Sequence, residues 1–322
     1  MKDTEYTYAV AYMKTLENKM LSQNDFEALL SSPDVKSGIK LLIDKGYGAN
    51  LSGTEGIDEI LASELEKIWT EAKNVCPDGA PLDVLLYQND YHNLKTILKA
   101  SVTNVDWHDM LLKPCITDPE NISEAIKTTD FESLPDFIKE EAREAYKIIT
   151  ETNDGQLTEI YLDKACWEQM AKRAYDEKND FLIGWVNLNI TVADFKIAVR
   201  AVGKSKEFIK DALIRSDGFN PDKLVEAALS SLQAVIDAIA SYGYADAADC
   251  LKESFSAFEK WCDNQKIRYI KKAKLKNFGF EPILGFLIGK EFELQTVRII
   301  LSGKANNVPV QIIKERLRDL YV

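Results

Sequence analysis

LQTVRIILSG at residues 294–303 decides the fold, because two related stretches occur upstream of it. These are YHNLKTILKA at 91–100 and ITVADFKIAVRA at 190–201. Aligning the three stretches places Lys95, Lys196 and Arg298 at one position, with spacings of 101 and 102 residues (196 − 95 and 298 − 196). Repetition of this kind indicates three copies of one structural unit.

The repeats predict three domains, at 1–113, 114–216 and 217–322. The second opens with a connector that contains Pro114 and Pro119. The third opens with Asn220-Pro221-Asp222, in which asparagine is a good helix cap and proline suits the first helical position. A chain of 322 residues has room for two or three domains.

Helical periodicity runs through nearly the whole chain. Apolar residues recur every three or four positions, and the nine prolines fall at the starts, ends or connections of the expected helices. No convincing alternation of apolar and polar residues is present. The sequence therefore predicts an all-α fold. Its longer helices are expected at about 82–100, 157–177, 181–213, 224–242, 245–276 and 282–302.

Charge and composition exclude several classes of protein. The formal net charge of −12 argues against a nucleic-acid-binding chain, which needs clustered basic residues for the phosphates. The five cysteines are an odd number without metal-site spacing, which fits a reducing compartment. No apolar run is long enough to cross a bilayer, so the sequence predicts no transmembrane segment and a cytosolic or peripheral protein.

Motifs for catalysis are absent from the sequence. Gly203-Lys204-Ser205 resembles the end of a phosphate-binding loop, but an alanine stands where the first glycine belongs and no strand precedes it. Gly285 and Gly289 lie in an apolar helix and are interpreted as packing glycines. His92 and His108 lack the second ligand of a metal-binding helix. We expect no enzyme activity, catalytic residue, cofactor, metal or small-molecule substrate.

Two acids accompany the repeated cations. Asp90 and Glu293 lie five residues before Lys95 and Arg298, a separation that does not bring side chains together on one helix. The partners of these cations must lie elsewhere in the fold or on another protein. Asp90, Lys95, Lys196, Glu293 and Arg298 are therefore candidates either for structural ion pairs between helices or for a partner-facing surface.

A second candidate is a run of cations at 266–276 that contains no acid and is interleaved with apolar residues. One interpretation is a solvated helix face; the other is a docking surface for an acidic partner or for anionic lipid headgroups. The cations of this run are Lys266, Arg268, Lys271, Lys272, Lys274 and Lys276.

The combination of these motifs resembles the C subunit of bacterial and archaeal V-type (A-type) ATPases, the counterpart of the d subunit of the eukaryotic V-ATPase. The resemblance covers the whole chain and depends on the set, not on a single residue. One departure is Tyr12-Met13-Lys14, where the family leads us to expect an arginine-bearing segment. The matching stretches are Tyr8-Ala9, Leu16-Glu17, 90–95, Leu98-Lys99-Ala100, Asp194-Phe195-Lys196, Arg200-Ala201, 290–293, 297–300, 302–304, Pro309, Ile312, 315–317 and 320–322.

The resemblance implies three similar helical domains around a pseudo-threefold axis, in a funnel-shaped arrangement. It implies a non-catalytic central-stalk (rotor) protein, a socket between the D and F shaft subunits and the proteolipid rotor ring. The protein would lie peripherally on the cytoplasmic face of the membrane and link ATP hydrolysis or synthesis to H⁺ or Na⁺ transport. The alternatives are a cytosolic helical scaffold without a rotary role and a helical enzyme with an unrecognised site.

Overall fold

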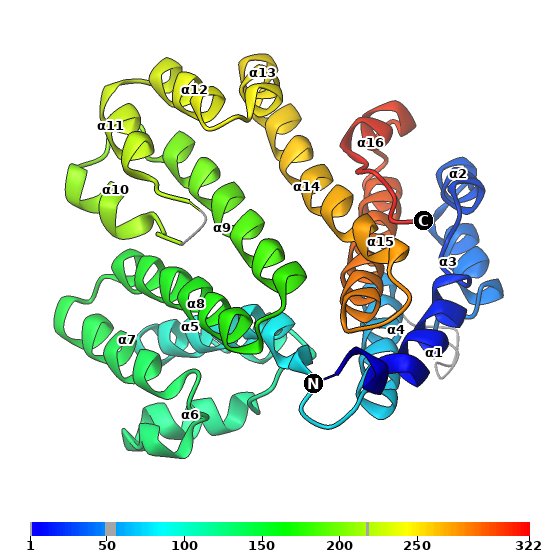
Figure 1. Ribbon diagram of the computed structural model, residues 1–322, viewed down its shortest axis with the longest axis horizontal. Coiled ribbons are helices and arrows are strands. Elements are labelled where there is room, and N and C mark those ends of the chain that lie inside the picture. Colours follow the sequence, from blue (N-terminus) through cyan, green and yellow to red (C-terminus); the bar gives the residue numbers. More distant parts are fainter. Residues whose placement is uncertain (1, 49–55, 217–218) are drawn as a thin grey trace. The chain divides into compact units, whose positions relative to one another are not determined.

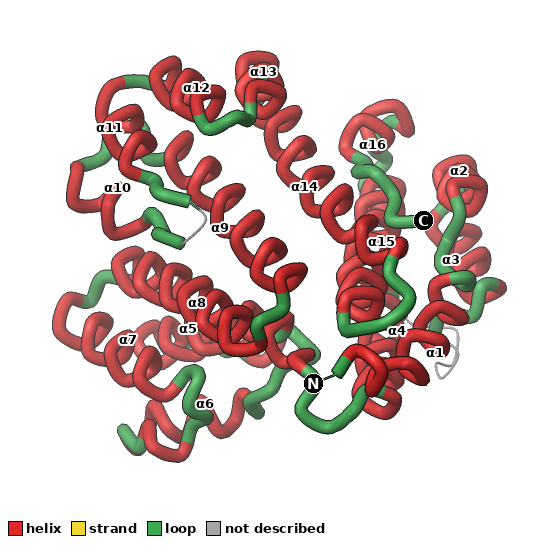
Figure 2. Tube along the Cα trace, viewed as in Figure 1, coloured by secondary structure: helices red, strands yellow, loops and turns green. Residues whose placement is uncertain are grey.

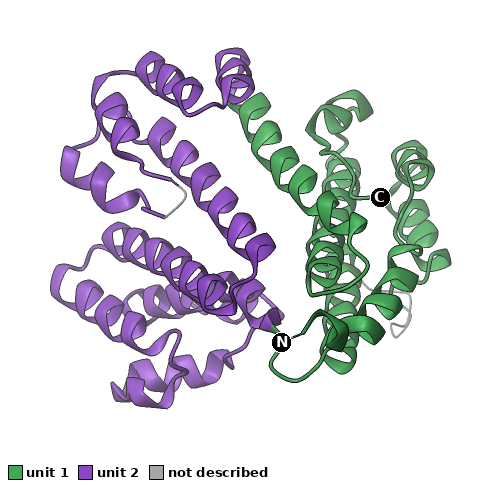
Figure 3. Cartoon of the chain, in the orientation of Figure 1, with its two compact units in different colours: residues 1–80, 255–322 green, residues 81–254 purple. Residues whose placement is uncertain are grey.

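The computed structural model describes residues 2–48, 56–216 and 219–322 and confirms the predicted all-α fold. Helices and short 3₁₀ turns account for the regular structure, and no β-strand occurs in these ranges (Figures 1 and 2). The chain forms two compact units, residues 1–80 with 255–322 and residues 81–254 (Figure 3).

Unit 1 combines the two ends of the chain. Its elements are η1 (Asp3–Tyr6), α1 (Thr7–Glu17), α2 (Gln23–Ser31), α3 (Val35–Asp44), α4 (Ile57–Val75), α14 (Phe255–Lys271), η5 (Lys272–Leu275), α15 (Glu281–Ala305) and α16 (Val310–Arg316).

Unit 2 contains the middle of the chain. Its elements are η2 (Pro81–Leu85), α5 (Tyr87–Thr103), η3 (His108–Met110), α6 (Pro119–Thr128), η4 (Phe131–Ser133), α7 (Lys139–Thr152), α8 (Gly155–Glu177), α9 (Asp180–Arg200), α10 (Lys206–Ala212), α11 (Asp222–Ser230), α12 (Leu232–Ser241) and α13 (Ala245–Glu253).

Helix α15, which carries the opening stretch, is the centre of unit 1. It packs on α1, α2, α3, α4, α14 and α16, and is buried on most sides. Val297, Ile300 and Leu301 are fully buried, and each contributes about 1.5–3 kcal/mol through removal from water. The apolar cluster around them contains Leu21, Phe26, Leu29, Leu30, Leu42, Tyr47, Ile60, Leu61, Leu294 and Ile313.

Helices α8 and α9 have the corresponding place in unit 2. Helix α8 packs on α5, α7, α9 and α10, and α9 packs on α8, α10, α11 and α12. By length and composition α9 is the one helix of the described ranges that is apolar enough to cross a membrane. Because 56% of its apolar window is buried inside the protein, its apolarity is that of a core helix.

Three predicted helices are interrupted in the structure. The helix expected at 224–242 breaks at Ser231, whose backbone is extended (φ −168°, ψ 166°) and whose hydroxyl accepts the Ala234 N–H at 3.1 Å. The helix expected at 245–276 breaks at Ser254, whose backbone is extended (φ −168°, ψ 159°), and α14 begins at the next residue. The helix expected at 181–213 ends at Arg200 and restarts after Ser205, whose hydroxyl accepts the Phe208 N–H at 3.2 Å. Serine is a strong helix cap, and apolar periodicity alone does not detect that signal.

The packing units differ from the repeats found in the sequence. The first repeat contributes α4, which packs on α15 of the third repeat, and the second repeat contributes α8, which packs on α5 of the first. A signature helix is thus covered by the long helix of another repeat. The borders of the compact units fall at 80 and 254, whereas the domain borders at 113 and 216 describe sequence kinship and stay a prediction.

Candidate functional site

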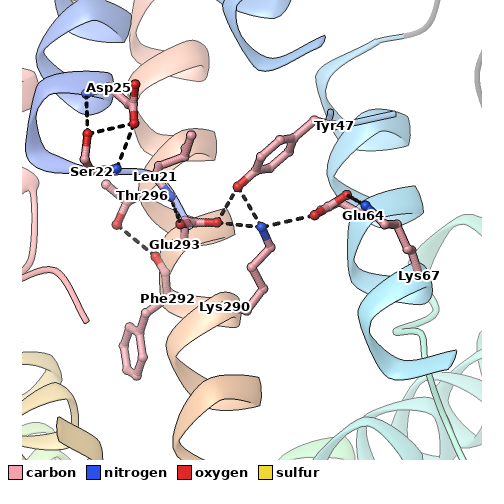
Figure 4. Close-up of polar contacts among 10 residues, drawn as sticks. All are labelled: Leu21, Ser22, Asp25, Tyr47, Glu64, Lys67, Lys290, Phe292, Glu293 and Thr296. Atoms are coloured by element: carbon pink, nitrogen blue, oxygen red, sulfur yellow. Dashed lines mark hydrogen bonds and ion pairs between the residues drawn. The ribbon is translucent and has the colours of Figure 1, made fainter. Parts of the chain in front are cut away.

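A buried network of charged groups joins α15 to α4 in unit 1. Lys290 and Glu293 lie one turn apart on α15, and Figure 4 shows them pointing toward Glu64 on α4. The Lys290 Nζ lies 2.7 Å from Glu293 Oε1 and 3.1 Å from Glu64 Oε1. The three residues are 3%, 4% and 5% exposed, so solvent screens these ion pairs weakly.

The network is neutral and almost fully hydrogen-bonded. Lys67 lies 3.3 Å from the second oxygen of Glu64, so two cations face two carboxylates. The second oxygen of Glu293 accepts the backbone N–H of Leu21 at 2.6 Å, just before α2 begins. Burial of charge is tolerated where every partner is present in this way. The pairs therefore fix the positions of α4, α15 and the start of α2.

Tyr47 completes the network from the segment after α3. Its hydroxyl donates to Glu293 Oε1 and accepts from Lys290 Nζ at 2.8 Å, and that nitrogen lies 4.3 Å from the ring centroid (Figure 4). Burial, reinforced by the Glu293 charge, raises the pKa of Tyr47 well above its usual value. The phenol stays neutral and acts only as a hydrogen-bonding link.

Glu293 and Asp90 occupy one position of the repeat and make the same kind of contact. The two oxygens of Asp90 accept the N–H groups of Ile116 and Thr117 at 2.8 and 2.7 Å, on the segment that precedes α6. Glu293 accepts the N–H of Leu21 on the segment that precedes α2. Each buried carboxylate thus anchors the approach to another helix, and neither pairs with the cation five residues ahead of it.

Two of the three repeated cations face acids on neighbouring helices. Lys95 on α5 pairs with Asp163 on α8, and Arg298 on α15 lies 3.1 Å from Asp58 on α4. Because Arg298 and Asp58 are well exposed, their pair is worth about 0–1 kcal/mol. Lys196 is half-buried on α9.

A second repeated contact, a hydrogen bond from backbone to a polar side chain, appears only in the structure. Asn93 and Asp194 lie 101 residues apart (194 − 93), at one position of the repeat. Asn93 Oδ1 accepts the Leu112 N–H at 2.8 Å, and Asp194 Oδ1 accepts the Ile214 N–H at 2.9 Å. In both repeats the polar side chain two residues before the aligned lysine anchors backbone near the end of the same repeat, after η3 in the first and after α10 in the second. The shared position in the repeat was the sequence signal that could have identified these two residues. The search for apolar periodicity did not detect it, because both residues are polar.

Asp194 is less well satisfied than Asp90. It is fully buried, and its Oδ2 has no hydrogen-bond partner within the described ranges. Burial raises the pKa of Asp194 to about 8, against which the Ile214 N–H acts in the opposite direction. Between about pH 4 and pH 8 the unfolded chain releases this proton and the folded chain keeps it. Stability is lost as the pH rises through that window, by at most about 1.4 kcal/mol per pH unit.

Asp194→Asn is therefore expected to stabilise the protein relative to the native chain by an amount that grows from about pH 5 to about pH 8. The amide keeps an oxygen for the Ile214 N–H and has no proton to release. Urea unfolding of both chains at the two pH values measures the difference. Asp90→Asn is the control: its amide nitrogen would face an N–H donor, so a loss of about 1–3 kcal/mol is expected at both pH values. A difference for Asp194→Asn that does not change with pH would contradict the assignment.

The cations of the lysine-rich run at 266–276 differ in their exposure and in their contacts. Lys266 and Arg268 lie on α14, half-buried and exposed respectively. Lys274 lies 2.9 Å from Glu17, with its nitrogen 4.9 Å from the Tyr321 ring centroid. Lys271, Lys272 and Lys276 are exposed around η5.

The structure confirms the interpretation of Gly285 and Gly289 as packing residues. A Cβ at Gly289 would lie 2.5 Å from two ring atoms of Tyr321, and one at Gly285 would lie 2.7 Å from the Ala273 Cβ. The Tyr321 side chain is buried against this notch in α15. The chain segment after α16 is thereby fastened to the central helix.

Fold and site together define a class: an all-helical protein whose buried charged groups hold helices in place. Within the described ranges no group of three or more His, Cys, Asp or Glu side chains is placed to hold a metal ion. Residues 9–316 match the ATP synthase (C/AC39) subunit family, and the chain belongs to this family. The family resemblance seen in the sequence is thereby confirmed.

Relatives from bacteria and archaea match over almost their full lengths. The chain is 22% identical to the C subunit of the V-type sodium ATPase of Enterococcus hirae, over 98% of this chain and 99% of the relative. It is 24% identical to the C subunit of the A-type ATP synthase of Methanocaldococcus jannaschii, over 98% and 86%. It is 22% identical to the C subunit of the V-type ATP synthase of Thermus thermophilus, over 97% and 98%.

Proposed function

We propose that this chain is the non-catalytic central-stalk subunit of a V/A-type rotary ATPase. In this role it receives the D and F shaft subunits and rests on the proteolipid rotor ring, so that rotation links ATP hydrolysis or synthesis to H⁺ or Na⁺ transport. The observation that carries the proposal is the family match over residues 9–316, together with relatives of similar length that are named as the C subunit of such enzymes.

The interior of unit 1 suits the transmission of torque. A rotor element must resist shear between its helices, and dense apolar packing gives low compressibility. Here α15 is surrounded by six helices, and the Lys290 network ties α15 directly to α4. These buried charges therefore support a mechanical role, in which side chains hold geometry and transform no substrate.

The proposal includes three repeat domains, at 1–113, 114–216 and 217–322, arranged as a pseudo-threefold funnel. The hydrogen bonds that Asn93 and Asp194 accept from backbone N–H groups support the relationship between the first two repeats, since they lie at equivalent positions. The protein is expected on the cytoplasmic face of the membrane, as a peripheral component. Nucleic acid and small molecules are not among the expected partners.

Binding to the two neighbouring subcomplexes tests the proposal. The purified chain is expected to co-elute with the D–F pair and, separately, with the detergent-solubilised proteolipid ring at low salt. A chain that binds neither would favour the helical-scaffold alternative. Turnover of ATP by the isolated chain would contradict the non-catalytic assignment.

A further inference from the structure

The turn at residues 271–278, here named the lysine turn, exposes two large apolar side chains. Leu275 is 84% exposed, more than any other large hydrophobic side chain of the described ranges, and Phe278 is 56% exposed. Both lie in unit 1, on and just after η5. An isolated exposed apolar residue is common, but two of them on one short turn are a feature that folding of this chain does not require.

The backbone beneath these side chains is held in place. Ala273 is buried, and Lys274 pairs with Glu17 of α1. Lys14 donates to the side-chain oxygen of Asn277 at 2.8 Å, and the Gly279 N–H donates to the Asp3 carbonyl at 3.3 Å. The turn therefore presents Leu275 and Phe278 from an anchored base.

Exposed cations surround the apolar pair. Lys271, Lys272 and Lys276 are solvent-exposed, and no acid occurs between residues 264 and 280. In a chain of net charge −12 this local surplus is of the opposite sign to the protein as a whole. The nearest acids at the far end of the turn are Asp3 and Glu281, which approach Gly279.

We propose that the lysine turn binds the surface of a bilayer that contains anionic phospholipids. The lysines would neutralise headgroup phosphates while Leu275 and Phe278 enter the boundary between headgroups and acyl chains. A stable protein interface buries roughly 800 Å² per partner and needs complementary shape across that whole area. A bilayer needs no complementary pocket, so this small patch suits a lipid surface better than a protein groove.

The proposal goes beyond the function in the central stalk and does not depend on it. A peripheral protein of a membrane complex would gain a second, direct contact with the membrane. Because the contact involves lipid and not the D, F or ring subunits, its failure would leave the binding tests above unaffected.

Vesicle flotation of the full chain is the test. The chain is expected to float with phosphatidylcholine vesicles that contain phosphatidylglycerol, to remain behind with pure phosphatidylcholine vesicles, and to bind more weakly as salt is added. Replacing Lys271, Lys272 and Lys276 by alanine is expected to lower the affinity about fivefold per lysine, or roughly 100-fold together. Lys274 is left intact because it supports the fold through Glu17.

Lys204→Ala, Lys206→Ala and Lys210→Ala together form the matched control, since they remove three exposed lysines from unit 2 and change the net charge equally. This control is expected to bind as the native chain does. The double variant Leu275→Ser with Phe278→Ser separates the apolar contribution from that of the charges. It is expected to weaken vesicle binding more at high salt than at low salt, because salt screens the lysines and leaves the apolar contact to dominate. The proposal would be overturned if both triple-lysine variants lost affinity equally, or if the native chain bound equally well with and without phosphatidylglycerol. Far-UV circular dichroism shows whether each variant is folded.

Discussion

Lys290→Met is expected to lower the free energy of unfolding by about 3–5 kcal/mol, a large fraction of the total for most domains. Methionine fills a similar volume, but it strands the Glu293 carboxylate, which is 4% exposed, without its cation. Glu64 keeps only its longer contact to Lys67 at 3.3 Å. Urea unfolding followed by fluorescence and by circular dichroism measures the loss.

Lys95→Met is the matched control for this prediction. Lys95 is also a lysine on a signature helix, but its partner Asp163 is more than half exposed, so a loss of at most about 1 kcal/mol is expected. The double variant Lys290→Met with Glu293→Gln is expected to recover part of the loss, because glutamine still accepts the Leu21 N–H and carries no charge. If Lys290→Met and Lys95→Met had equal effects, the buried network would make no special contribution to stability.

Gly289→Ala is expected to destabilise unit 1 by about 1–3 kcal/mol or more, although alanine is the better helix former. Its new methyl group would lie 2.5 Å from the Tyr321 ring, so the ring has to leave its buried site. Gly155→Ala is the control, because a Cβ at that helical position would meet its nearest neighbour, Lys99, only at 3.9 Å. No destabilisation is expected there.

Tyr321 variants test whether this clash is the cause. Tyr321→Phe is expected to be neutral or slightly stabilising, since its buried hydroxyl has no hydrogen-bond partner within the described ranges. Adding Gly289→Ala to Tyr321→Ala is expected to produce little further loss, because the ring is already gone. Additive effects of the two substitutions would show that Gly289 acts through some other contact. Thermal unfolding of the four chains completes the cycle.

Sequence reasoning succeeded where a short stretch carries the information. The 3.6-residue period of apolar residues predicted helices, and it identified Val297, Ile300 and Leu301 as packing residues of α15. It failed at Ser231, at Ser254 and at 201–205, where the helix stops although the apolar pattern continues on both sides. The hydroxyls of Ser205 and Ser231 each accept a backbone N–H of the helix that follows, and apolar periodicity takes no account of such local bonds.

The candidate sites were anticipated only in part. Glu293 and Asp90 stood out because they precede repeated cations, but each accepts backbone N–H groups from a distant part of the chain, and Glu293 also pairs with Lys290. Lys290 directly follows Gly289 in the sequence, and nothing in its neighbourhood indicated Glu64 as a partner. The lysine run looked uniform in the sequence, whereas Lys274 is bound to Glu17 and the others around the turn are exposed.

The sequence by itself determined the helical class, the repeated signature, the buried face of α15 and membership of the family, because periodicity and motif matching depend on residues close together in the chain. Only the tertiary structure decided that α4 covers α15 and that α8 covers α5, and hence which charges meet. Many amphipathic helices can cover one apolar face, since the hydrophobic effect is not directional. The choice among them rests on the close packing of side chains that are distant in sequence, as where Lys290 meets Glu64.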